Sequence, residues 1–119
     1  MMNEQIGDDS AGLTIAEAQR AVDASIIALG GYWPPLANLA RLFEECGELA
    51  RAVNQIAGHK RVKPGEAQAA AQEELGDILY TALVLANSLG IDGDVALRQA
   101  LAKTASRVPK PNTTSETHH

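Results

Sequence analysis

Aliphatic residues recur at the spacing of an α-helix in four separate stretches of this 119-residue chain. The first stretch shows the pattern clearly, with apolar residues three or four positions apart at Ile15, Ala18, Val22, Ile26 and Leu29. That period places them on one face of a helix. Aromatic residues make up only 3% of the chain, so its interior must consist mainly of Ala, Leu, Val and Ile. The pattern predicts an all-α fold with one core.

Capping and helix-breaking residues give the expected boundaries of these helices. Thr14 followed by Glu17 has the pattern of a capping box, in which two side chains satisfy free backbone N–H groups. Pro35 is suited to the first turn of the second helix, and Asp92 is suited to cap the last one. We therefore predict helices over residues 14–29, 35–57, 66–88 and 92–107.

The second predicted helix carries the clearest apolar stripe, formed by Leu39, Phe43, Cys46, Ala50 and Val53. We expect this stripe to face the core, with Leu42, Leu49 and Ile56 widening it. Cys46 lies within the stripe and is interpreted as a buried structural thiol. The third helix has a wider apolar arc, which predicts two packed sides and therefore an oligomer.

The two long helices are joined by a basic loop, His59 to Gly65, and we expect them to be antiparallel neighbours. Residues 1–13 are polar and are predicted to be flexible. Residues 108–119 are rich in Ser, Thr and Pro and are predicted to be a disordered tail. The folded domain is thus expected to span residues 14–107.

The charge balance narrows the classes of partner. The formal net charge is −5, and there is no Lys/Arg stripe with interleaved aromatics, so we expect no nucleic-acid partner. No apolar run approaches the ~18 residues of a membrane span, so we expect no membrane partner. The N-terminal residues lack the pattern of a signal peptide, and the single cysteine cannot form an internal disulfide. We interpret the protein as cytoplasmic.

Two acidic pairs are the strongest indication of chemistry. Glu45 and Glu48 lie three apart on the second helix, and Glu74 and Asp77 lie three apart on the third. Each pair projects from one helix face, so an antiparallel hairpin would bring four carboxylates together. Their repulsion would require a cation, and oxygen-only ligands favour Mg²⁺, with Mn²⁺ as the second choice.

Other interpretations of these acidic residues remain open at this point. Acidic residues on helices are often simply solvated, and the chain could be a non-enzymatic helical interaction module. A di-iron carboxylate bundle would need Glu-x-x-His pairs, which the sequence lacks. Glu44 and Glu73 precede the two pairs and could activate water or be solvated.

Two segments resemble the signatures of MazG-like nucleotide pyrophosphohydrolases. They are residues 42–50, Leu-Phe-Glu-Glu-Cys-Gly-Glu-Leu-Ala, and residues 73–79, Glu-Glu-Leu-Gly-Asp-Ile-Leu. The family pattern is ExxE, a variable spacer and then ExxD, and the resemblance extends over about residues 18–107. It implies a four- to five-helix bundle of the short single-domain branch, organised around a central antiparallel helix hairpin. It also implies hydrolysis of nucleoside triphosphates to monophosphate and pyrophosphate, often as house-cleaning of non-canonical or excess nucleotides.

The same resemblance assigns expected roles to individual residues. Glu45, Glu48, Glu74 and Asp77 would be the Mg²⁺ ligands, with Glu44 as a further catalytic candidate. Lys103 and Arg107 match the cations that help to hold phosphates near the end of the last helix, although Ala105 stands where related sequences often carry Asn. The remaining substrate-binding candidates are Lys63, for phosphate, and Trp33, which could stack on a base or anchor its loop. The resemblance also implies a homodimer or a homotetramer.

Overall fold

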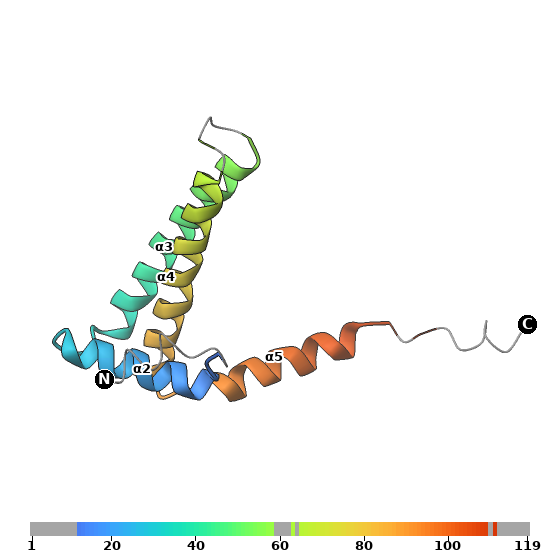
Figure 1. Cartoon of the computed structure of the whole chain (residues 1–119). Coiled ribbons are helices and arrows are strands. Elements are labelled where there is room, and N and C mark those ends of the chain that lie inside the picture. The colour runs from blue at the N-terminus through green and yellow to red at the C-terminus, as the bar shows by residue number, and fades with distance from the viewer. Residues whose placement is uncertain (1–11, 59–62, 64, 110, 112–119) are drawn as a thin grey trace, which may run out of the picture.

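The computed structural model describes residues 12–58, 63, 65–109 and 111. Over these ranges the chain forms helices α2 (Ile15–Ala28), α3 (Pro35–Ile56), α4 (Glu66–Ser88) and α5 (Gly93–Arg107), labelled as in Figure 1. The same ranges contain no β-strand, so the all-α prediction is confirmed. Most of the predicted flexible N-terminus, basic loop and C-terminal tail lies outside the described residues.

The helix ends are formed by the residues that the sequence indicates. The Thr14 hydroxyl accepts a hydrogen bond from the Glu17 amide at 3.0 Å, and the Glu17 carboxylate accepts one from the Thr14 amide at 2.8 Å. This reciprocal pair is a capping box. Asp92 caps α5 by accepting from the Asp94 amide at 2.9 Å. These contacts are local, which explains why the predicted boundaries are close to the observed ones.

Helices α3 and α4 lie side by side and make the most extensive helix contact in the described structure (Figure 1). Helix α2 crosses the end of this pair where α3 begins and α4 ends, and it packs on α4. Helix α5 follows a bend of 111° after α4 and leads away from the α3–α4 pair (Figure 1). It packs on α2, so it lies outside the contact between the two long helices.

Gln19 ties α2 to the junction between α4 and α5. Its amide nitrogen donates to the Asn87 side-chain oxygen at 2.9 Å and to the Ile91 carbonyl at 3.0 Å. Its amide oxygen accepts from the Gly93 backbone N–H at 2.8 Å. A Cβ atom at Gly93 would lie 3.0 Å from an Ile15 methyl group, so glycine permits this close approach.

The apolar core of a single chain is small. Its buried apolar side chains within the described ranges are Val22, Ala52, Ala67 and Val84. By contrast, Phe43 is 67% exposed and Leu79 is 61% exposed. No residue of α5 is buried. Exposed apolar surface of this extent is typical of a protein region that packs against a partner.

The predicted orientation of α3 is wrong in one respect. Four of the five residues in its main apolar stripe are exposed, namely Phe43, Cys46, Ala50 and Val53. The prediction that Cys46 is buried is therefore also wrong. Helix α4 instead packs on the adjacent face, where Asn38, Glu45 and Ala52 are buried at seven-residue spacing. Leu42 and Leu49, expected only to widen the stripe, lie half-buried on this face.

None of the described helices is by itself long and apolar enough to cross a membrane. Helices α4 and α5 reach that length and composition only when taken together, across their 111° bend.

Candidate metal centre

Three acidic side chains meet between the middle parts of α3 and α4. Glu45 comes from α3, whereas Glu74 and Asp77 come from α4. One carboxylate oxygen from each lies within 4.8 Å of the other two. The fourth predicted ligand, Glu48, is not in this group and its side chain is exposed one turn further along α3. The predicted convergence of two acidic pairs is thus observed for three of the four residues.

The seven-residue spacing along the helix contact explains why these residues meet. Glu45 lies midway between the buried Asn38 and Ala52 on α3. Glu74 lies midway between the buried Ala67 and Thr81 on α4. Residues at this spacing stay on the contact face of two packed helices, where apolar side chains are usual. Carboxylates here are costly unless they are compensated, so a cation is favoured.

The electrostatics of the group also favour a cation. Desolvation raises the pKa of Glu74, and the neighbouring charges of Glu45, Asp77, Glu48 and Glu73 raise it further. A raised carboxyl pKa means that the charged form is disfavoured, and nearby positive charge would relieve this. Glu48 therefore lies close enough to contribute to the field, although it is outside the tight group.

The donor set fits a hard divalent cation. All three donors are carboxylate oxygens, which Mg²⁺ and Mn²⁺ accept. In an octahedral shell with ligand bonds of about 2.1 Å, opposite oxygens lie roughly 4.2 Å apart. Adjacent oxygens lie roughly 3.0 Å apart, and three oxygens of one shell include at least two adjacent pairs. A group within 4.8 Å would therefore draw closer together around a bound ion. The two glycines inside the acidic segments, Gly47 and Gly76, have no neighbouring atom within 4 Å of an added Cβ, so packing within the described chain does not explain them.

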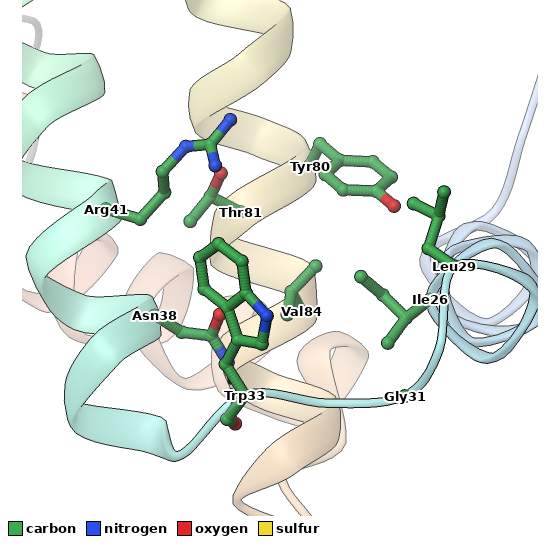
Figure 2. A pocket seen from close by; sticks show the side chains of 9 residues that line it. All are labelled: Ile26, Leu29, Gly31, Trp33, Asn38, Arg41, Tyr80, Thr81 and Val84. Atoms are coloured by element: carbon green, nitrogen blue, oxygen red, sulfur yellow. Dashed lines mark hydrogen bonds between the residues drawn. The ribbon is translucent and has the colours of Figure 1, made fainter.

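A cavity of about 220 Å³ adjoins the acidic group along the same helix contact. It lies between α2, α4, the start of α3 and the connection before α3 (Figure 2). Thr81, in its wall, is one helical turn beyond Asp77. Figure 2 shows the Trp33 ring entering the cavity beside Asn38, with Val84 on the α4 side. A cavity with a partly apolar wall therefore adjoins the candidate metal centre.

Two polar contacts fix the wall of this cavity. The buried Asn38 amide donates to the Trp33 carbonyl at 3.3 Å. The Tyr32 hydroxyl donates to the Asp23 carboxylate on α2. Desolvation raises the pKa of Tyr32, and its hydrogen bond to Asp23 raises it further. These contacts hold the connection that carries Trp33.

Arg41 joins the cavity to the acidic group. Its Nε donates to Glu45 Oε2 at 3.2 Å, and its side chain also lines the cavity (Figure 2). Arg41 is not part of either acidic segment that the sequence indicates. Its position four residues before Glu45 could have indicated an ion pair, because residues at that spacing are neighbours on a helix. Asn38 was also missed, although it lies on the same helix face seven residues before Glu45.

Four other predicted site residues are not part of the three-carboxylate group. Glu44 and Lys63 are exposed. Lys103 and Arg107 are exposed on α5, which leads away from the α3–α4 pair (Figure 1). Any role of these four residues at the acidic group stays a prediction.

Comparison with known proteins identifies the family. Residues 34–111 match the MazG nucleotide pyrophosphohydrolase domain. The chain is 42% identical over 95 residues to the uncharacterized protein YpjD of Bacillus subtilis strain 168, covering 79% of this chain and 86% of YpjD.

Two crystal structures are also similar. That of the Bacillus-conserved MazG protein, a nucleotide pyrophosphohydrolase, has 36% identity and a TM-score of 0.68, covering 87% of this chain and 97% of that one. That of Bacillus subtilis YpjD has 42% identity and a TM-score of 0.69, covering 76% of this chain and 94% of that one. The resemblance predicted from the two acidic segments is confirmed: this chain belongs to the MazG nucleotide pyrophosphohydrolase family.

Proposed function

We propose that this chain is a Mg²⁺-dependent nucleoside triphosphate pyrophosphohydrolase that releases a nucleoside monophosphate and pyrophosphate. The main support is the group of three carboxylates, Glu45, Glu74 and Asp77, within 4.8 Å of one another. The group lies inside the family match, and a similar solved protein is described as a nucleotide pyrophosphohydrolase. We further propose that its cellular role is house-cleaning of non-canonical or excess nucleotides.

The three grouped carboxylates would hold the cation, with Mg²⁺ first and Mn²⁺ as the alternative. Glu48 would complete the acidic set by turning its exposed side chain toward Glu74, on which its charge already acts. A bound divalent cation would supply positive charge against the phosphate oxygens and help to lower the barrier to hydrolysis. Mg²⁺ commonly keeps several waters and shares its shell with substrate phosphates, which suits a site with few protein ligands.

The reaction consumes one water molecule per bond broken. The water oxygen forms a bond to one phosphorus of the α–β anhydride, as the bond from that phosphorus to the bridging oxygen breaks. The bridging oxygen leaves with the other phosphoryl group. We propose that Glu44, adjacent to Glu45 on α3, accepts the proton lost by the water, as a general base does.

The cavity beside Arg41 would receive the nucleobase. Its volume of about 220 Å³ suits one ring system rather than a large ligand, and Trp33 offers a face for stacking. With its base in this cavity, the nucleotide would run along the α3–α4 contact and place its phosphates at the carboxylates. Lys103, Arg107 and Lys63 are proposed to neutralise the phosphate charge.

We infer that a second copy completes this arrangement. The α3–α4 pair would act as an antiparallel hairpin and pack against its counterpart in a homodimer or homotetramer. The support is the exposed apolar surface on both helices, which includes Phe43 and Leu79. Because α5 leads away from its own hairpin, Lys103 and Arg107 near its end would serve the site of a neighbouring subunit.

The decisive experiment is a panel of canonical and damaged nucleoside triphosphates with a pyrophosphate readout. The wild-type chain should release pyrophosphate with Mg²⁺ and stop when the metal is chelated. Asp77→Asn should lower kcat by at least about a hundredfold, because it removes a charged ligand while keeping the shape. Glu66→Gln, an exposed acid at the start of the same helix, is the matched control and should retain activity.

Two outcomes would contradict the proposal. One is an absence of metal-dependent turnover on every nucleotide in the panel, which would favour the helical interaction module. The other is full activity in Asp77→Asn, which would remove the acidic group from the mechanism.

A further inference from the structure

Arg41 lies at the boundary between the acidic group and the cavity. Its guanidinium donates to Glu45 at 3.2 Å, while its side chain remains 50% exposed. The Glu45 side chain is only 11% exposed, so the buried end of this ion pair is the carboxylate. Within the ranges that the structure describes, Arg41 is the cation that forms an ion pair with the three-carboxylate group. It is therefore positioned as a local counterion.

A divalent cation and Arg41 would compete for the same negative charge. A cation bound by Glu45 at about 2.1 Å would lie roughly 5 Å from the guanidinium in its present position. At that distance the two positive charges repel each other appreciably, even in a high dielectric. Arg41 is attached to α3 one turn before Glu45. Because its side chain is half exposed, the guanidinium can move away from Glu45 without disturbing the helix contact. Metal binding would thus favour release of Arg41.

The cavity supplies a place for the released guanidinium to act. Arg41 lines the cavity together with Trp33, Asn38 and Thr81 (Figure 2). A nucleotide with its base in this cavity and its phosphates at the carboxylates must pass Arg41. The planar guanidinium can donate two parallel hydrogen bonds to a phosphate, which a lysine cannot do.

We propose that Arg41 is an exchanging counterion and positioning residue. It neutralises Glu45 in the metal-free protein, gives up that contact when the divalent cation binds, and then holds the phosphate chain of the nucleotide. This inference rests on the proposed function, since it uses the same acidic group and the same nucleotide class. It adds a coupling, in which metal binding frees the residue that positions the substrate.

The test measures metal binding and nucleotide binding separately on the full chain. Mn²⁺ is titrated into nucleotide-free protein by calorimetry, and a non-hydrolysable nucleoside triphosphate analogue is titrated at saturating Mg²⁺. Arg41→Gln should bind Mn²⁺ about tenfold more tightly at low salt, because a competing positive charge is gone. It should bind the analogue at least about tenfold more weakly.

Two further variants separate charge from geometry. Arg41→Lys should bind Mn²⁺ like the wild type, because the charge returns, but should recover only part of the analogue affinity. Arg98→Gln is the matched control, because Arg98 forms an ion pair at the same four-residue spacing with Asp94 on α5, at 2.9 Å. It should change neither affinity. Circular dichroism should show the same helical content for all variants.

Weaker Mn²⁺ binding by Arg41→Gln would overturn the exchange, because Arg41 would then simply orient Glu45 as a ligand. Unchanged analogue binding would overturn the phosphate contact. A wild-type chain that hydrolyses nucleotides while Arg41→Gln behaves identically would refute only this inference. A wild-type chain that binds neither Mn²⁺ nor the analogue would overturn the proposed function as well.

Discussion

Phe43 offers the sharpest test of self-association through the α3–α4 pair. The residue lies two positions before the buried Glu45 in α3, yet it is 67% exposed. A phenylalanine side chain offers roughly 200 Å² of surface, so about 130 Å² is open in one chain. We expect Phe43→Ser to weaken the association of two copies, because the polar side chain cannot replace this apolar contact.

The magnitude follows from the open area. At about 25 cal/mol per Å², full burial of the open Phe43 surface would contribute about 3 kcal/mol per chain. A two-fold dimer uses the residue twice, which gives about 6 kcal/mol as an upper bound. Because each 1.4 kcal/mol changes a dissociation constant tenfold, burial of half to all of this area predicts a loss of roughly 10²- to 10⁴-fold.

Sedimentation velocity over a dilution series measures this loss directly. The matched control is Ile27→Ser on α2, since Ile27 is 62% exposed but lies outside the α3–α4 pair. The wild type and the control should sediment as the same oligomer, whereas Phe43→Ser should dissociate at much higher concentration. A wild-type monomer at every concentration, or an unchanged oligomer in Phe43→Ser, would refute the reasoning.

Two further predictions concern stability. The pKa of Glu74 is raised in the folded protein, so the folded state binds this proton more readily than the unfolded chain does. Ionised Glu74 therefore lowers the free energy of unfolding. This loss of stability is complete above the raised pKa and disappears as the pH falls toward 4.5, the ordinary value. In chelator, Glu74→Gln should therefore melt above the wild type at neutral pH and lose this advantage on acidification; a difference that is constant with pH would contradict the shift. Gln19→Ala removes three hydrogen bonds and should lower the free energy of unfolding by about 2 kcal/mol in urea, whereas the exposed Gln68→Ala should have little effect. Equal midpoints for these two glutamine variants would show that Gln19 does not tie α2 to the α4–α5 junction.

The elements that could be predicted from the sequence are those that depend on near neighbours. Thr14 and Glu17 cap α2 through contacts three residues apart, and Asp92 caps α5 through contacts two and three residues away. The orientation of α3 could not be predicted in the same way. Its apolar residues extend over more than one face, and periodicity alone does not say which face meets α4. The structure assigns α4 to the face of Glu45, and the more apolar face of Phe43 stays open.

Part of the candidate site could likewise be predicted from near neighbours in the sequence, whereas the rest depends on how the helices pack. The three-residue spacing predicted that each acidic pair shares a helix face, and the helix contact brings Glu45, Glu74 and Asp77 together. Glu48 lies outside this group and is exposed, although its three-residue step from Glu45 equals the step from Glu74 to Asp77, so spacing alone could not distinguish the two. The sequence could not show that Arg41 belongs to the site, because Arg41 lines a cavity that forms only when α2, α3 and α4 pack together.

The placement of acids in the helix contact links the proposed chemistry to the open apolar surface. Glu45 and Glu74 occupy contact positions that a stable helix pair would give to apolar residues, and the raised pKa of Glu74 reflects the resulting conflict. The remaining buried apolar contacts at these helices come from small or medium side chains such as Ala52, Ala67 and Val84. A pair weakened in this way needs stabilisation from outside itself. A bound cation would relieve the acidic group, and a second copy would cover the exposed face of Phe43, so both should raise the melting temperature together. If the metal stabilised Phe43→Ser as much as the wild type, cation binding and self-association would be independent in this protein.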